Sequence, residues 1–174
     1  MTGVYLSDSW SIAEYLEKQY PDTPSLFPNN TKGLQAALTD GHHASLANVW
    51  AFAIPATHAI LNPESEKYFR RTREMTFGVK MEEITPKGER AVEEWAKFKA
   101  NLDKVDTWFT KTDDKGPFIL GDTISWTDLN VASWTTWWRA VWGEDSEEWK
   151  DVASWNGGRW NDLLVALEKY SRDI

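Results

Sequence analysis

The segment from Thr85 to Phe109 constrains the fold more than any other part of the chain. Thr85-Pro86 is a typical helix start, because proline is tolerated in the first helical turn. Apolar residues then recur three or four positions apart, which predicts one long amphipathic helix. They are Val92, Trp95, Phe98, Leu102, Val105, Trp108 and Phe109.

Most of the remaining sequence is also predicted to be helical, so we expect an all-α fold. Asn62-Pro63 is a second N-cap and N1 pair, opening a helix that reaches roughly Glu83. A long helix is expected from about Thr31, with Gly41 and Pro55 weakening or kinking it. The other helices are predicted at 9–19, 124–141, around 147 and at 160–171, and residues 4–6 are predicted as a short strand.

Length and composition indicate a compact soluble protein without disulfides. The 174 residues suffice for a sizeable core, and the absence of cysteine excludes disulfide or cysteine–metal frameworks. The net charge of −8 argues against a nucleic-acid partner, since such binding relies on basic patches. No apolar run approaches the roughly 20 residues that a membrane span needs, and the first residues lack the pattern of a secretory signal.

Asp8 and Ser9 are the first candidate binding residues, because they directly precede a predicted amphipathic helix. Ser9 is expected to cap that helix, whose free N–H groups and positive dipole end favour a carboxylate. The neighbouring Asp8 can hold a cationic amine. A ligand with an amine and a carboxylate on one carbon would fit this pair, although capping alone also explains both residues.

A second motif, Gly121-Asp122-Thr123-Ile124-Ser125-Trp126-Thr127-Asp128, has a structural explanation. Ser125 and Asp128 form a variant capping box, and Ile124 and Leu129 have the spacing of a hydrophobic staple. Both devices fix the start of a helix. We therefore predict that this motif serves folding rather than chemistry.

Twelve tryptophans are unusual in a chain of this length. Four of them lie in one predicted helix at spacings of three, one and four residues, so most share one face: Trp134, Trp137, Trp138 and Trp142. A core role explains most tryptophans. Clustered indole rings also suit the wall of a pocket for flat aromatic ligands, and the spacing leaves open which of the four would face it.

Charged and imidazole side chains offer two weaker candidates. Arg70 and Arg73 lie among acidic residues on one predicted helix, which favours a solvated face, but arginine is also suited to gripping a carboxylate. His42 and His43 follow Asp40, yet adjacent helical residues point about 100° apart, and no third ligand has clear spacing. No metal site is therefore predicted.

The two motifs together resemble those of cytosolic glutathione transferases. The family combines an acid–serine pair with an Ile-Ala-x-Tyr-Leu helix and a Tyr-Pro, matched here by Asp8-Ser9, residues 12–16 and Tyr20-Pro21. Its Gly-Asp-x-x-Ser-x-Ala-Asp box matches residues 121–128, with Thr127 in place of alanine. The run at 68–74, followed by Phe77-Gly78, further resembles the fungal etherase-like (FuA) class.

The resemblance implies a helical C-terminal domain at 28–174, preceded at 1–27 by the last strand and helix of a thioredoxin-like domain and a linker. It implies glutathione as co-substrate bound by Asp8 and Ser9, aromatic substrates near the four tryptophans, a homodimeric full-length parent and a cytoplasmic location. The family activates the glutathione thiol with a Tyr, Ser or Cys near the start of the thioredoxin-like domain. Tyr5 and Ser7 do not match that position, so the catalytic residue is unknown.

Three functions remain open at this point. The chain is expected to derive from a glutathione transferase that conjugates or reduces aromatic electrophiles. Alternatively, it is a non-catalytic, ligandin-type binder of apolar aromatic molecules. A third possibility is a module for dimerisation. The three functions predict different results. The first predicts ligand binding that depends on glutathione, the second ligand binding without glutathione, and the third a stable oligomer without ligand affinity.

Overall fold

The computed structural model describes residues 5–112 and 116–170. Within those ranges the secondary structure is helical, with two isolated bridges, Phe118 to Gly121 and Leu120 to Thr123, as the sole extended pairings. The predicted all-α class is confirmed. The α-helices are α1 (Ser9–Gln19), α2 (Lys32–Ser45), α3 (Trp50–Ile60), α4 (Pro63–Phe77), α5 (Met81–Ile84), α6 (Glu89–Thr110), α7 (Trp126–Trp142), α8 (Glu147–Ser154) and α9 (Arg159–Leu167). Short 3₁₀ turns lie at Pro28–Asn30, Trp155–Gly158 and Glu168–Tyr170.

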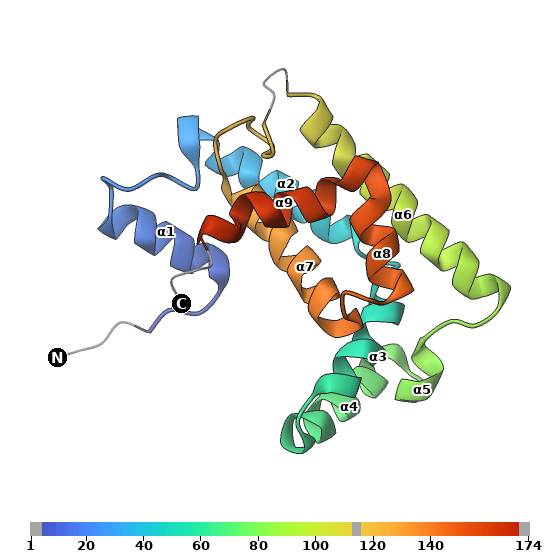
Figure 1. The fold of residues 1–174 in the computed structure, drawn as a ribbon. Coiled ribbons are helices and arrows are strands. Elements are labelled where there is room, and N and C mark those ends of the chain that lie inside the picture. The colour runs from blue at the N-terminus through green and yellow to red at the C-terminus, as the bar shows by residue number, and fades with distance from the viewer. Residues whose placement is uncertain (1–4, 113–115, 171–174) are drawn as a thin grey trace.

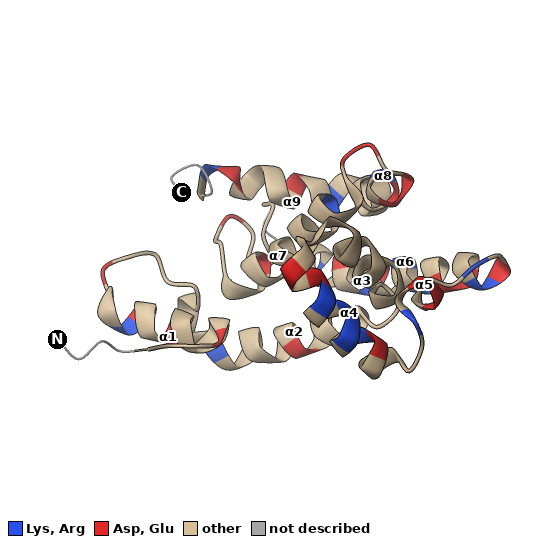
Figure 2. Cartoon of the chain, turned by 90° about the horizontal axis from the view of Figure 1, so that it is seen from below, with Lys and Arg blue, Asp and Glu red and all other residues tan. Residues whose placement is uncertain are grey.

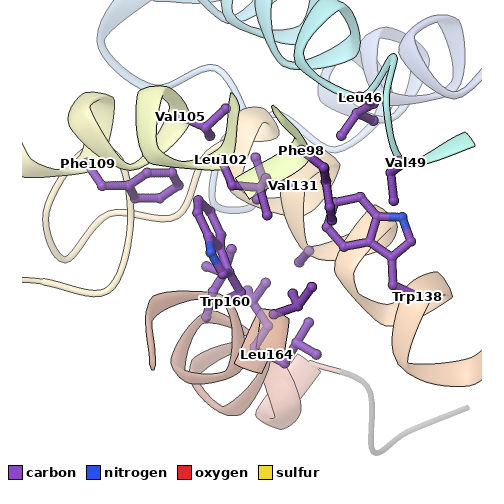
Figure 3. Close-up of a cluster of buried hydrophobic side chains, with 14 of the residues drawn as sticks. Leu46, Val49, Phe98, Leu102, Val105, Phe109, Val131, Trp138, Trp160 and Leu164 are labelled. Carbon is purple, nitrogen blue, oxygen red and sulfur yellow. The ribbon is translucent and has the colours of Figure 1, made fainter. Parts of the chain in front are cut away.

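Helix α6 is the long helix expected from the sequence, and its apolar side forms one wall of the main core. Phe98, Leu102, Val105 and Phe109 are its buried residues. They face α7 and α9, where Trp138 and Trp160 fill the space between the helices (Figure 3). The helix begins at Glu89 rather than at Pro86, because Gly88 takes a positive φ of 59° just before it.

The long helix predicted from Thr31 is two helices, α2 and α3, and the expected site of the kink was wrong. Neither Gly41 nor Pro55 interrupts its helix; the break falls at residues 46–49. Gly41 instead permits a close approach of α6, since a Cβ there would lie 3.3 Å from the ring of Trp108. The turn at the break buries both Leu46 and Val49 completely.

The helix predicted to start at Asn62-Pro63 does start there, and the Asn62 side chain accepts a hydrogen bond of 2.9 Å from the Ser65 N–H. It ends at Phe77, short of Glu83, because Gly78 adopts the left-handed conformation that closes many helices. The separate turn α5 follows. Helices α3, α4 and α5 pack together at one end of the molecule, away from α1 (Figure 1).

The remaining expectations differ mainly at helix ends. The helix predicted at 124–141 begins at Trp126, and the last α-helix spans Arg159–Leu167. Tyr5 and Leu6 belong to no strand, and Val4 and Ser171, which bounded two predicted elements, lie outside the described residues. Within the described ranges, no helix is both long and apolar enough to cross a membrane.

Candidate functional site

The start of α1 carries the predicted acid–serine pair, but the two residues exchange their expected roles. Asp8, not Ser9, is the N-cap, and its carboxylate accepts a hydrogen bond of 3.0 Å from the Ser11 N–H. Ser9 is the first helical residue, and both side chains are exposed. Asp8 has φ 77° and ψ 126°, a conformation that L-residues rarely adopt and that often marks functional sites.

This arrangement leaves groups free for a ligand. The backbone N–H groups of Ser9 and Trp10 have no hydrogen-bond partner among the described residues. They point out of the positive end of the helix dipole, beside the Ser9 hydroxyl. One Asp8 oxygen is engaged as the cap while the other stays available. A carboxylate at the N–H groups and an amine at Asp8 can therefore be bound together.

Helix α1 is held in place by a small aromatic cluster of its own. Trp10, Phe27 and Trp126 pack with ring centroids 4.9–6.1 Å apart, around the buried Ala13. The Leu26 carbonyl accepts a hydrogen bond of 2.8 Å from the Trp126 N–H. The cluster joins the candidate glutathione-binding helix to the first turn of α7.

The opposite face of α1 is uncovered. Ile12, Tyr15 and Leu16 are 37–44% exposed, at the i, i+3, i+4 spacing of a helix face. Tyr20, just beyond the helix, is 59% exposed. These side chains form an apolar surface next to the Asp8-Ser9 pair.

The capping box at the start of α7 is confirmed, and it is buried. Asp128 accepts hydrogen bonds from the Ser125 N–H and hydroxyl at 2.8 and 2.7 Å, and from the Ile119 N–H at 2.8 Å. Burial raises the pKa of Asp128, partly offset by these bonds. Gln35 of α2 accepts from both the N–H and the hydroxyl of Thr127. These buried contacts fix the start of α7, as predicted for this motif.

The four tryptophans of α7 occupy different environments. Trp138 is a core residue, 1% exposed, with Phe98 against its ring (Figure 3). Trp142 stacks on Trp138. Trp134 and Trp137 instead pack against Trp50 of α3, with ring centroids 5.2 and 5.9 Å apart. Their role as a pocket wall stays a prediction.

Arg70 and Arg73 of α4 also differ. Arg70 pairs with Glu66, Glu74 and Glu82 at 2.8–3.2 Å, and Glu66 also contacts His58. Among the described residues Arg73 has no ion pair, and its buried Nε has no hydrogen-bond partner. Its guanidinium lies 5.0 Å from the centroid of the Phe69 ring.

Arg73 lines a cavity of about 340 Å³, together with Trp50, Ile54, Thr76 and Phe77. Nothing in the sequence marks Trp50, Ile54 or Phe77 as site residues. Spacing alone does not show that α3 and α4 enclose a space. The cavity is formed where α3 and α4 pack together, and the sequence pattern does not indicate that contact.

The adjacent histidines do not meet at a site. His42 is fully buried, with Nδ1 3.0 Å from the Asn130 side-chain oxygen, and burial lowers its pKa to about 4. His43 packs edge-on against Trp134. Among the described residues, no group of three or more potential ligands lies close enough to hold a metal ion.

Comparison with known proteins identifies the fold. Residues 33–170 match the model of the glutathione S-transferase C-terminal domain. The structure is similar to glutathione S-transferase CsGST63524 of Ceriporiopsis subvermispora, solved in complex with glutathione (39% identity, TM-score 0.88, 94% of this chain and 66% of that one). It is also similar to GSTFuA3 of Phanerochaete chrysosporium (33% identity, TM-score 0.85, 94% of this chain and 64% of that one).

A further relative is the glutathione S-transferase-like protein ustS of Aspergillus flavus, 26% identical over 92% of this chain and 59% of its own length. The chain thus spans about three fifths of that relative and about two thirds of the solved structures. The part of the chain that matches the family model contains the helical core and the buried capping box. The chain belongs to the glutathione transferase family, and its match to the family lies in the C-terminal helical domain.

Proposed function

We propose that this chain is the helical part of a glutathione transferase, and that Asp8 and Ser9 form half of its glutathione site. The observation that carries the proposal is the start of α1, where an exposed acid–serine pair adjoins backbone N–H groups to which no described residue is hydrogen-bonded. The amine and carboxylate of the γ-glutamyl end of glutathione match Asp8 and the helix end, respectively. Two similar solved structures hold glutathione, which supports this assignment.

The uncovered face of α1 supports the same proposal. Ile12, Tyr15 and Leu16 form an apolar surface beside the pair. In our proposal, residues 1–27 belong to a thioredoxin-like domain whose remainder covers this face, and residues 28–174 form the helical domain. The residue that activates the thiol then lies in that remainder, so the full-length parent performs the chemistry.

The finer assignments belong to the proposal as well. Identities of 33% to GSTFuA2 and GSTFuA3 favour the fungal etherase-like class. The parent then conjugates or reduces aromatic electrophiles as a cytoplasmic homodimer. In this scheme two of the four tryptophans, Trp134 and Trp137, line the pocket for the aromatic substrate. Both pack against Trp50.

Isothermal titration calorimetry of the chain with reduced glutathione tests the glutathione half-site. We expect saturable binding, with a Kd near the millimolar range because half of the site is missing. Asp8→Asn should weaken it by about tenfold, since asparagine keeps the cap but loses the charge that holds the amine. Ser9→Ala should weaken it by a similar factor by removing the hydroxyl.

Asp22→Asn is the matched control, because it removes an exposed charge from the nearby connector without touching the helix start. It should bind glutathione like the unmodified chain. Equal affinity of all four proteins would remove Asp8 and Ser9 from the site. If none of the four proteins binds glutathione, the start of α1 is not a glutathione half-site.

A further inference from the structure

We propose that a cavity between α3, α6 and α8 binds a small organic cation that carries a trimethylammonium group. The cavity has a volume of about 250 Å³. It is lined by Phe52, Ala91, Val92, Trp95, Glu147, Glu148 and Asp151. Helix α8 and the start of α6 lie on one side of the molecule and α1 on the other (Figure 1 and Figure 2). This site is therefore separate from the proposed glutathione half-site.

Two aromatic rings form a corner of the cavity. The rings of Phe52 and Trp95 have centroids 5.0 Å apart and planes inclined at 68°. The indole of Trp95 is held by ring contacts with Phe98 and Trp142, at 5.4 and 5.6 Å, and its N–H donates to Asp151 at 2.8 Å. The corner is thus preformed by packing. A cation that enters it is attracted by the π-electrons of the rings, most strongly by those of tryptophan.

Carboxylates border the same cavity on the side of α8. Glu147 pairs with Lys150 at 2.9 Å, but Glu148 has no ion pair among the described residues. One oxygen of Asp151 accepts from the indole N–H, which leaves the other for electrostatic attraction of a ligand. Acidic residues gather on α8 and in the turn that precedes it (Figure 2). The charge of this border favours a cation and disfavours an anion.

The apolar part of the lining selects among cations. Ala91 and Val92 extend the surface of the two rings, and Val92 is 71% exposed, so this surface is accessible from solvent. A primary ammonium has three N–H donors, for which the ring corner provides no acceptor. A trimethylammonium group has no donor, and its methyl groups pack against apolar surface while its charge faces the rings. The volume lies below the usual range for drug-sized ligands, which favours a small molecule.

NMR titration of the isotope-labelled chain with choline and with 3,3-dimethylbutan-1-ol tests the proposal. The alcohol has the shape of choline, with a carbon in place of the charged nitrogen. Choline should bind about tenfold more tightly, because the rings and the carboxylates attract only the charged probe. The indole N–H signal of Trp95, identified by its loss in Trp95→Phe, should shift as the site saturates.

Two variants separate the contributions of ring and charge. Phe52→Leu keeps an apolar side chain but removes one ring, and Glu148→Gln removes one carboxylate from the border. Each should weaken choline binding by about threefold and leave binding of the alcohol unchanged. Glu64→Gln is the matched control, because it changes the net charge equally but lies in the first turn of α4, outside the cavity lining. It should bind choline like the unmodified chain.

A peptide containing trimethyllysine distinguishes the source of the cation. It should bind no more tightly than choline, because the cavity holds only the head group, and a complex tenfold tighter would assign the site to a protein partner instead of a small molecule. Absence of choline binding, equal affinity for choline and the alcohol, or saturation without a shift of the Trp95 signal would each overturn the proposal. So would a preference for choline that is unchanged in both Phe52→Leu and Glu148→Gln.

Discussion

Helices α1 and α7 start with the same two residue types, yet the starts serve different purposes. At α7, Ser125 and Asp128 are fully buried, and the N–H groups of residues 125–127 are bonded to Asp128, Leu26 and Gln35. At α1, Asp8 satisfies one N–H group and both residues are exposed. Capping chemistry inside the protein stabilises the fold, whereas the same chemistry at the surface leaves donors available for a ligand.

The largest expected effect is at the buried start. Asp128→Ala removes the acceptor of three buried hydrogen bonds and orphans donors on Ile119 and Ser125. We expect a loss of about 4 kcal/mol in the free energy of unfolding, from the usual penalty for each unsatisfied donor. Urea denaturation followed by circular dichroism measures it. Asp122→Ala, an exposed acid in the same loop, is the control, and equal losses in both variants would contradict the comparison.

The second largest expected effect is a pH dependence of the free energy of unfolding. It comes from His42, which joins α2 to Asn130 of α7. Burial lowers the pKa of His42 to about 4, whereas an unfolded histidine titrates near 6.5. The unfolded chain therefore binds a proton that the folded chain excludes between these values. The stability contribution is complete above pH 6.5 and is lost as the pH falls toward 4, by about 3 kcal/mol.

Unfolding measurements across this pH range, on the unmodified chain and on His42→Phe, isolate the contribution of His42. The variant should show a flatter dependence whatever its overall stability, because phenylalanine has no proton to bind. Parallel curves for the unmodified chain and His42→Phe would show that His42 does not titrate in this way.

The smallest effect is at the exposed start. Asp8→Ala removes a single hydrogen bond to the Ser11 N–H, and water can replace it. We expect a loss of about 1 kcal/mol or less in the free energy of unfolding. Thermal melting of Asp8→Ala beside Ser146→Ala, which removes the N-cap of α8, gives the comparison. A loss from Asp8→Ala as large as that from Asp128→Ala would remove the distinction between the two starts.

Local signals predicted most of the helices, because caps and apolar spacing act over a few residues. Asn62, Ser125 and Asp128 do what their positions indicate. The errors came from distant contacts. Gly41 was expected to weaken a helix, but it makes room for Trp108, a residue far along the chain.

The candidate sites show the same limit. The sequence identified Asp8 and Ser9, yet it assigned the cap to the wrong one of the two. It grouped Arg70 with Arg73, and only their surroundings separate an arginine held by three carboxylates from one that has no ion pair among the described residues. Spacing placed most of four tryptophans on one helix face, but it did not show that Trp138 is enclosed while Trp134 and Trp137 contact Trp50.

The aromatic cluster of Trp10, Phe27 and Trp126 has a consequence for protein engineering. One of its members lies on α1, one in the connector and one at the start of α7. A chimera that joined residues 1–27 of one relative to the helical domain of another would combine indole and phenyl rings that were not selected together. All three residues of the cluster should therefore come from the same parent. The crossover point of a chimera should be chosen so that residues in contact stay together, even when they are far apart in the sequence.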